Sequence, residues 1–237
     1  MKWRSLQESA PVTDTRRLYE IFSERRELIA RYVPAEIQAI HAKAVGELKR
    51  AGIAEKALKA GDPAPDFELP DQNGKVVRSA DLVSRGSLVL CFIRGRWCPF
   101  CVGQIEAMNA IVPELEELGA SMVAISPQTV HQSFLMADQH KLQFPLLSDA
   151  GNLVGRKLGL VYRVPEYQQE VYRRALVNLP FVNGDAGWEL PIPATYILKP
   201  NVGDVSATHT LYAYVNPDYT ERPEPADLLA KVAQLLS

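Results

Sequence analysis

The stretch that decides the fold is Ser87-Leu88-Val89-Leu90-Cys91-Phe92-Ile93-Arg94-Gly95-Arg96-Trp97-Cys98-Pro99-Phe100-Cys101. Its segment 88–93 is a continuous apolar run, which is typical of a strand buried on both faces. After Cys101, apolar side chains recur at the spacing of one helix face as far as Gly119. We therefore expect a buried strand that leads directly to the two cysteines and a helix that begins at them.

The chain on the C-terminal side continues this alternation. The patterns predict strands over 121–125, 144–147, 194–198 and 211–215, and helices over 129–141, 151–159 and 225–236. The last two strands are joined by a short turn at 200–203, so they must be antiparallel. Strands that alternate with helices imply βαβ units with right-handed crossovers. The sequence therefore predicts an α/β fold with a mixed, mostly parallel central sheet flanked by helices.

The first 60 residues have the pattern of helices. Residues 18–32 place apolar side chains on one helix face, with Thr13 or Asp14 as the N-cap, and residues 34–52 predict a second helix. Each apolar face needs a partner, which the rest of the chain or another subunit could supply. We therefore expect an N-terminal helical extension over residues 1–60.

The main domain is expected to span residues 61–237. A change of composition at Gly61-Asp62-Pro63-Ala64-Pro65-Asp66 marks its start. Alternating residues on both sides of Asn73-Gly74 predict a β-hairpin with a type I′ turn. Residues 162–192 interrupt the alternation of strands and helices, so we expect an insertion there, with a helix over 165–176.

The composition limits the classes of function. Apolar residues make up 47% of the 237 residues and charged residues 23%, which is ordinary for a globular protein. The net charge is −2 and no basic stripe occurs, so a nucleic acid is not an expected partner. No apolar run is long enough to span a bilayer, and the N-terminus lacks the apolar core of a secretory signal. We expect a cytoplasmic protein without a membrane partner.

The pair Cys98 and Cys101 carries the expected chemistry. Cys98 would be the N-cap of the following helix, where free backbone N–H groups and the helix dipole favour an anion. Arg94 and Arg96 add positive charge, and Pro99 suits the first helical turn. A thiolate is the nucleophilic form of cysteine, so we expect a lowered pKa and high reactivity for Cys98. Cys101 lies one turn further on the same face, where a disulfide could form.

Other interpretations of the cysteines are weaker. Three cysteines are too few, and odd in number, for a secreted disulfide framework. Structural zinc needs four ligands, and the four histidines show no paired spacing. Two inert, buried cysteines remain an alternative, although a strand-to-helix junction rarely buries them. We expect no metal and no organic cofactor, and we place Cys91, which lies in the apolar strand, in the core.

Several segments together resemble the alkyl hydroperoxide reductase/thiol-specific antioxidant family. They are 61–67, 94–101, 144–149, 193–198 and the tail 215–219 with Glu224-Pro225. More narrowly, the chain resembles a peroxiredoxin-like branch of the thioredoxin superfamily with a Cys-Pro-x-Cys motif. The resemblance covers residues 61–237 and implies a thioredoxin-like fold for this domain.

The first departure from that family concerns the attacking residue. Peroxiredoxins carry Pro-x-x-x-Thr-x-x-Cys, which places Arg94 on the Pro, Cys98 on the Thr and Cys101 on the peroxidatic cysteine. This alignment makes Cys101 the attacking residue, whereas a thioredoxin-like alignment favours Cys98. We favour Cys98 because the N-cap is expected to be the more exposed and more electropositive position.

A second departure lies before the late strand. Family members place a peroxide-binding arginine there, but residues 189–195 contain none. Pro193 instead matches the cis-proline of thioredoxins, so we expect a cis bond beside the dithiol that helps to hold a disulfide-bearing partner. Trp97 is expected to cover Cys98. Three aromatic residues of the insertion either cover the substrate groove or pack a loop: Tyr167, Tyr172 and Trp188.

The resemblance predicts a peroxiredoxin-like antioxidant oxidoreductase. Cys98 attacks the O–O or S–S bond, Cys101 resolves the product as a disulfide, and a thioredoxin- or glutathione-type thiol restores it. Peroxide is narrowly favoured over a disulfide as the substrate. A disulfide reductase is the main alternative, and a non-catalytic thioredoxin-fold interaction protein is a second. Whether the chain forms a homodimer is left open.

Overall fold

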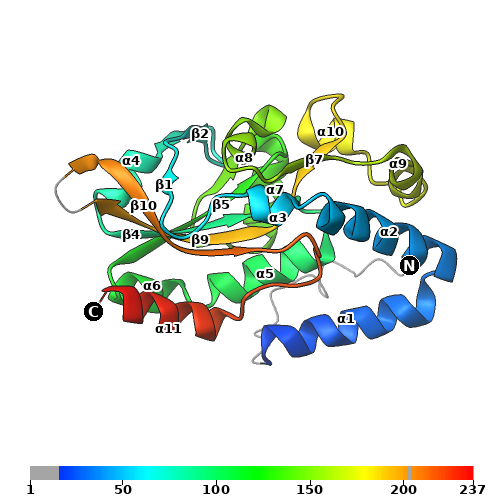
Figure 1. Ribbon diagram of the computed structural model, residues 1–237, viewed down its shortest axis with the longest axis horizontal. Helices are drawn as coiled ribbons and strands as arrows, with labels where there is room; N and C mark the ends of the chain where they lie inside the picture. The colour runs from blue at the N-terminus through cyan, green and yellow to red at the C-terminus, as the bar shows by residue number, and fades with distance from the viewer. Residues whose placement is uncertain (1–15, 202–203, 237) are drawn as a thin grey trace.

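The computed structural model describes residues 16–201 and 204–236, and its centre is a six-stranded sheet (Figure 1). The strand order is β1-β10-β9-β4-β5-β6. The bounds are β1 Pro63–Ala64, β4 Ser87–Phe92, β5 Ala120–Ser126, β6 Leu146–Ser148, β9 Ala194–Asn201 and β10 Asp204–Val215. β4 pairs with β5, and β5 with β6, in parallel, while the other three pairings are antiparallel. The sheet is mixed, as expected, but the prediction that it is mostly parallel is wrong, because β9 and β10 form a hairpin and β1 joins it antiparallel, which confines the parallel part to β4, β5 and β6.

β4 lies in the middle of the sheet, and both of its faces are buried. Leu88, Leu90 and Phe92 contribute to the core on one side, and Val89 and Cys91 to the core on the other. This alternation explains why the strand reads as a continuous apolar run in the sequence. It also confirms that Cys91 is a core residue.

One face of the sheet is covered by helices that share a core with α5 (Figure 1). These are α5 Pro99–Asn109, α6 Val112–Glu117, α7 Val130–Gln139 and α11 Pro225–Leu236. The sequence predicts one helix from the cysteines to Gly119, but the helix ends at Asn109 and a second one begins at Val112. Pro113 lies in the first turn of α6, where its missing N–H is tolerated.

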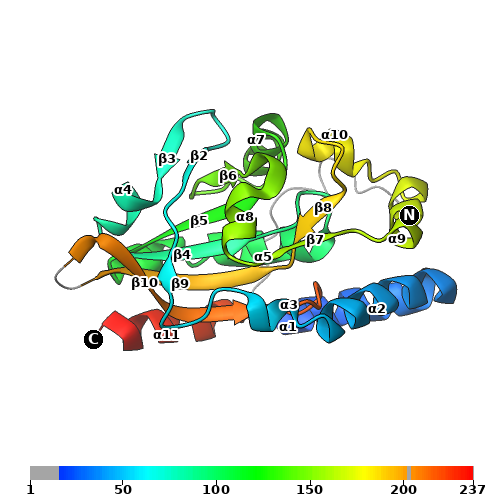
Figure 2. The ribbon, with the colours of Figure 1, turned by 45° about the horizontal axis from the view of Figure 1, so that its top comes forward.

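The other face carries the hairpin β2 Glu68–Pro70 and β3 Val76–Arg78, helix α4 Ser79–Val83, a 3₁₀ turn Ala150–Asn152 and α8 Leu153–Lys157 (Figure 2). The hairpin is present, but its connection differs from the predicted two-residue turn. Pro70 pairs with Val76, which leaves five residues, 71–75, between the strands. The Asp71 carboxylate accepts hydrogen bonds from the N–H groups of Asn73 at 2.8 Å and Lys75 at 2.9 Å, so it closes the longer loop.

The predicted insertion forms a small unit with its own core. It consists of β7 Val161–Arg163, α9 Glu166–Arg174, α10 Leu179–Asn183 and β8 Glu189–Pro191. β7 and β8 pair as a separate antiparallel sheet. The predicted helix over 165–176 is found as α9, whereas α10 and the two short strands were not expected.

The helical extension comprises α1 Leu18–Tyr32, α2 Ala35–Arg50 and α3 Ile53–Lys56, and it lies along the main domain (Figure 2). Thr13 and Asp14, the expected N-caps, lie outside the described residues. Part of the apolar face of α1 finds its partner within the same chain, because Leu18 and Phe22 are buried and Phe22 meets Phe100 of α5 edge to face at 5.1 Å. Leu28 and Tyr32, further along α1, stay exposed. The division of the chain at residue 60 stays a prediction.

No helix in the described part of the chain is both long and apolar enough to cross a bilayer.

Candidate active site

The two cysteines lie where the sequence predicts them, between β4 and α5. Cys98 is the N-cap of α5 with extended backbone, and Pro99 occupies the first helical turn. Gly95 turns the chain out of the strand with φ of +138°, a value that L side chains rarely adopt. A Cβ on Gly95 would lie 2.8 Å from Nε1 of Trp97, so the turn requires glycine.

Both side chains of the dithiol are buried. The exposed fraction is 1% for Cys98 and 0% for Cys101, and both cysteines are free thiols. The expectation that Cys98 would be the exposed member of the pair is therefore wrong. This end of α5 is enclosed by Phe22 of α1, which packs on Phe100, and by Tyr172 and Tyr219, which lie against Arg94; the sequence pattern carried no signal of that packing.

Of the two sulfurs, that of Cys101 is better stabilised as a thiolate than that of Cys98. It accepts hydrogen bonds from the backbone N–H of Arg94 at 3.4 Å and from Nη2 of Arg222 at 3.5 Å. Burial acts to raise the pKa of Cys101. A hydrogen bond from Cys98, the charges of Arg222 and Arg94 and the Arg94 N–H outweigh burial and lower the pKa to about 5.

The pKa of Cys98 shifts in the opposite direction. Burial, the hydrogen bond to Cys101 and repulsion from its charge raise this pKa well above that of an ordinary thiol. Nη1 of Arg94 lies 4.0 Å from the Cys98 sulfur and offsets only part of these effects. The predicted lowering of the Cys98 pKa is thus wrong, because the helix dipole argument ignored burial and the neighbouring sulfur.

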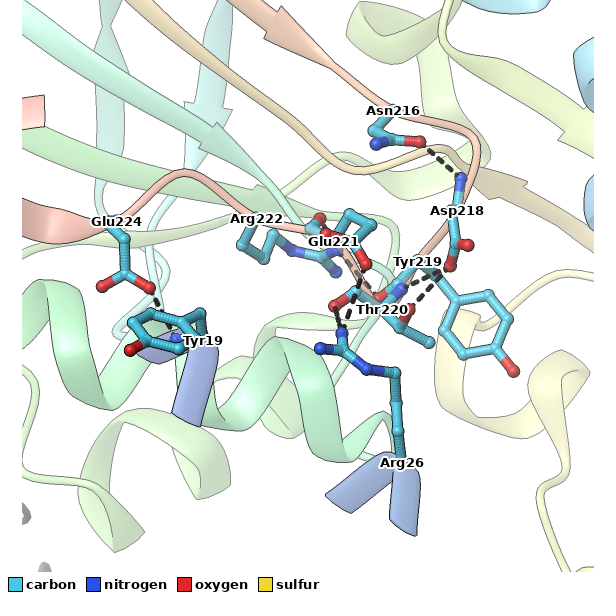
Figure 3. Close-up of polar contacts among 9 residues, drawn as sticks. All are labelled: Tyr19, Arg26, Asn216, Asp218, Tyr219, Thr220, Glu221, Arg222 and Glu224. Carbon is cyan, nitrogen blue, oxygen red and sulfur yellow. Dashed lines mark hydrogen bonds and ion pairs between the residues drawn. The ribbon is translucent and has the colours of Figure 1, made fainter. Parts of the chain in front are cut away.

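Arg222 is the functional candidate that the sequence analysis missed. It lies in the segment that follows β10, residues 216–224, which we call the C-terminal turn (Figure 3). Besides Cys101, its guanidinium donates to Gln104 Oε1 at 2.6 Å and to the carbonyl oxygens of Tyr219 and Glu221 at 2.8 and 2.7 Å. Family members place an arginine before β9. Arg222 lies instead between the two tail segments that resemble the family, 215–219 and Glu224-Pro225.

Arg94 brings a second positive charge to the dithiol. Its side chain is 2% exposed, and it forms no ion pair with a carboxylate of the described residues. Nη2 donates to the Tyr172 hydroxyl, and the guanidinium lies 4.7 Å from the Trp97 ring centre and 4.3 Å from that of Tyr219. A buried cation without a carboxylate favours an anion beside it, and the thiolate of the dithiol meets that need.

The other predicted site residues lie further from the sulfurs. The Arg96 guanidinium donates to Gln132 Oε1 of α7 at 3.2 Å, so it points away from the dithiol. Trp97 packs on Arg94, and its indole Nε1 is buried without a hydrogen-bond partner. The carbonyl of Pro193 accepts from the Asn216 N–H at 3.3 Å, which ties β9 to the C-terminal turn.

The expected cis bond at Pro193 is absent, since the described residues contain no cis peptide bond. That prediction was wrong: it extended the thioredoxin pattern to a proline that here only precedes β9.

One of the three aromatic residues of the insertion reaches the site. Tyr172 contacts Arg94, and its ring centre lies 5.2 Å from that of Trp97. Tyr167 instead donates to Glu47 of α2 at 2.5 Å, and Trp188 packs against Arg173 at 4.7 Å. The spacing of Tyr167 and Tyr172 puts them on different faces of α9, but periodicity alone could not tell which face meets the dithiol.

The donors near the dithiol do not suggest a metal centre. No group of three or more histidine, cysteine, aspartate or glutamate side chains gathers to hold an ion within the described residues. Cys91 contacts Thr195 Oγ1 at 3.7 Å, and burial raises its pKa to about 12, so it remains a neutral thiol.

Comparisons with known proteins point to one family. The AhpC/TSA family matches residues 60–206. A putative peroxiredoxin of Mycobacterium tuberculosis is 36% identical over 103 residues, which is 44% of this chain and 67% of that protein. Peroxiredoxin Bcp of Escherichia coli is 33% identical over 103 residues, which is 44% of this chain and 65% of that protein.

Solved structures share the fold. The crystal structure of peroxidoxin BcpB from Mycobacterium tuberculosis aligns with a TM-score of 0.57 at 24% identity, over 76% of this chain and 99% of that one. The thioredoxin-like fold expected for the main domain is thereby confirmed.

Proposed function

We propose, since the chain belongs to the AhpC/TSA family, that it is a thiol-dependent peroxidase whose attacking residue is Cys101. The observation that carries this proposal is the pair of donors on the Cys101 sulfur, Arg222 Nη2 at 3.5 Å and the Arg94 N–H at 3.4 Å. They favour a thiolate at neutral pH, and the thiolate is the form that attacks. The family alignment assigns the same position to the peroxidatic cysteine.

The proposed cycle uses both cysteines. The Cys101 thiolate attacks one peroxide oxygen, so an S–O bond forms, the O–O bond breaks and the departing oxygen takes a proton to leave as an alcohol or water. The Cys98 thiol then attacks the sulfenic sulfur, an S–S bond forms and water leaves. Two thiol equivalents from a thioredoxin- or glutathione-type donor reduce the disulfide. This reverses the roles that the sequence analysis gave to the two cysteines.

Other residues have supporting roles in this proposal. Arg94 and Arg222 stabilise the thiolate and the charge on the departing oxygen. Trp97 covers Arg94. Arg96 fixes the segment between β4 and α5 through its hydrogen bond to Gln132, and Pro193 anchors the C-terminal turn through its carbonyl. The cytoplasm, which keeps thiols reduced, is the compartment that suits the cycle.

Burial favours peroxide over a protein disulfide as the substrate. The two sulfurs are 1% and 0% exposed, so a molecule as small as a peroxide can reach them with far less rearrangement than a folded protein can. A disulfide reductase remains the second candidate, because the dithiol itself would serve either reaction. Reduction of a protein disulfide at a rate above that of peroxide would favour this candidate.

The proposal is tested by stopped-flow oxidation of the reduced protein with hydrogen peroxide. We expect a second-order rate far above that of a free thiol at the same pH, lost in Cys101→Ser and kept in Cys91→Ala. A wild-type rate equal to that of a free thiol would remove the peroxidase assignment.

A further inference from the structure

The N-terminal extension lies outside the region that the family matches, yet α1 contacts the C-terminal turn that holds Arg222 (Figure 3). Nη1 of Arg26, in the middle of α1, lies 3.2 Å from Glu221 Oε1 and 3.4 Å from the Thr220 carbonyl oxygen. Thr220 and Glu221 directly precede Arg222 in the chain. The ion pair therefore holds the two residues next to the one that contacts Cys101.

A second contact connects the start of α1 to the end of the same turn. The Glu224 carboxylate accepts a hydrogen bond from the Tyr19 N–H at 2.5 Å (Figure 3) and another from the Leu18 N–H at 3.0 Å. These are free backbone donors of a helix start, which also favours a negative charge. Glu224 thus caps the first turn of α1 from a distant part of the chain, in addition to Glu20 of α1 itself, which accepts from the Arg17 N–H at 3.2 Å. The extension therefore contacts the C-terminal turn on both sides of Arg222.

Other contacts hold the first half of the turn: the Asn216 N–H donates to the Pro193 carbonyl at 3.3 Å, and the Tyr219 ring lies 4.3 Å from the Arg94 guanidinium. Asp218 Oδ1 accepts from the Thr220 N–H at 3.0 Å and from its hydroxyl at 2.8 Å, which shapes the first half of the turn. In the second half, between Thr220 and Glu224, Arg222 donates to two carbonyl groups of the turn itself. These contacts within the turn do not reach the dithiol. Gln104 and α1 fix the second half of the turn against it.

We propose that Arg26 is a positioning residue for the dithiol: it fixes Thr220 and Glu221, and so keeps the Arg222 guanidinium against the Cys101 sulfur. The helical extension then contributes to the chemistry of the main domain without touching a reacting atom. This inference rests on the proposed role of Cys101 as the attacking thiolate.

The experiment titrates the thiolate of the reduced, full-length protein by its ultraviolet absorbance, with the trace of Cys101→Ser subtracted. This readout does not depend on reagent access to the buried sulfur. Arg26→Ala should raise the pKa of Cys101. The side chains of Arg26 and Glu221 are 40% and 49% exposed. An exposed ion pair of this kind changes an equilibrium constant by about two- to fivefold, so we expect peroxide reactivity at acidic pH to fall by that factor. Above the shifted pKa, the rates of variant and wild type should converge.

Three further variants make the result specific. Arg31→Ala removes the same charge from the same helix, where Arg31 lies 5.4 Å from the Tyr32 ring centre, and it should leave the titration unchanged. Arg26→Lys should restore part of the shift. In an Arg222→Gln background, Arg26→Ala should have no further effect, because the two residues act through one contact.

The outcomes separate the two proposals. An ordinary thiol pKa for Cys101 in the wild type would overturn the proposed function and this inference with it. A low wild-type pKa that Arg26→Ala leaves unchanged, or changes no more than Arg31→Ala does, would overturn this inference alone. Should Arg26→Ala fail to fold, Glu221→Gln tests the same ion pair from the other side, and an unchanged titration there would contradict the proposal.

Discussion

The guanidinium of Arg222 lies 3.5 Å from the sulfur of Cys101, although 121 residues separate the two in the sequence. The contact joins the start of α5 to the turn before α11, and both elements pack on the same face of the sheet. Arg94 approaches the dithiol from the other direction, at the end of β4. Two cations therefore face one pair of thiols, an arrangement that stabilises a single negative charge.

Substitution of each cysteine should separate the attacking residue from the resolving one. Cys101→Ser is expected to lose peroxide reactivity down to the background of an unactivated thiol, of which only a few per cent is thiolate at neutral pH. Cys98→Ser should retain the first, fast oxidation and stop at the sulfenic acid, because no partner sulfur remains. Stopped-flow oxidation followed by mass spectrometry of the product checks both expectations. Fast oxidation of Cys101→Ser would restore Cys98 as the nucleophile.

Removal of the Arg222 charge should change the pH dependence of the reaction. Arg222→Gln is expected to raise the pKa of Cys101 above about 5, because one of the interactions that lower it is gone. Each unit of increase costs about tenfold in thiolate fraction below the pKa and nothing well above it. The rate of oxidation, measured from acidic to alkaline pH, should therefore move its midpoint upward. Arg96→Gln is the matched control, since Arg96 points to α7, and an equal shift there would contradict this account.

The strand and the helix around the cysteines could be predicted because local patterns specify them. β4 reads as an apolar run because it is buried on both faces, and Pro99 marks the first turn of α5. The extension could likewise be predicted from the apolar positions of α1. The burial of Cys98 could not, because it depends on distant segments that meet at the start of α5, among them Tyr172 and Tyr219 against Arg94, and no period or spacing encodes those contacts.

The arginine of the site was missed for a related reason. Family patterns directed attention to the residues before β9, where no arginine occurs, and only the folded chain brings the C-terminal turn to the dithiol. The same limit explains why the sequence could not tell which aromatic residue of the insertion reaches the site. Tyr172 reaches Arg94 whereas Tyr167 faces α2, because the two lie on different faces of α9, and only the folded chain shows which face meets the dithiol.

His41 should make the packing of α2 sensitive to acid. Burial, followed by the charge of Arg94, lowers the pKa of His41 to about 4, so the folded state holds the neutral imidazole. Its contribution to stability is fully present above the unfolded pKa of about 6.5 and is lost as the pH falls through about 4. We expect a loss of ~1–3 kcal/mol across this window.

The measurement is chemical denaturation at neutral and at acidic pH. His41→Gln removes the titrating group, so the free energy of unfolding should differ less between the two pH values than it does in the wild type. An equal loss of stability in the variant would show that His41 does not cause it.

The close approach of α1 to α5 depends on Gly103. A Cβ at this position would lie 2.9 Å from Cε1 of Phe22 and 2.5 Å from Nη1 of Arg25, a side chain that also donates to the Pro99 carbonyl. Gly103→Ala should therefore push α1 away and destabilise the protein by ~1–3 kcal/mol, the usual cost of overpacking.

Gly46→Ala is the control, because Gly46 lies within α2 and the added Cβ would meet only the flexible end of Arg50, at 3.3 Å. This change should be neutral or stabilise the protein by up to ~1 kcal/mol, because alanine is more favourable than glycine within a helix. Thermal unfolding of both variants measures the difference. If Gly103→Ala were as stable as Gly46→Ala, α1 would not be packed as closely on α5 as the structure places it, and the burial of Cys98 and Cys101 would need another cause.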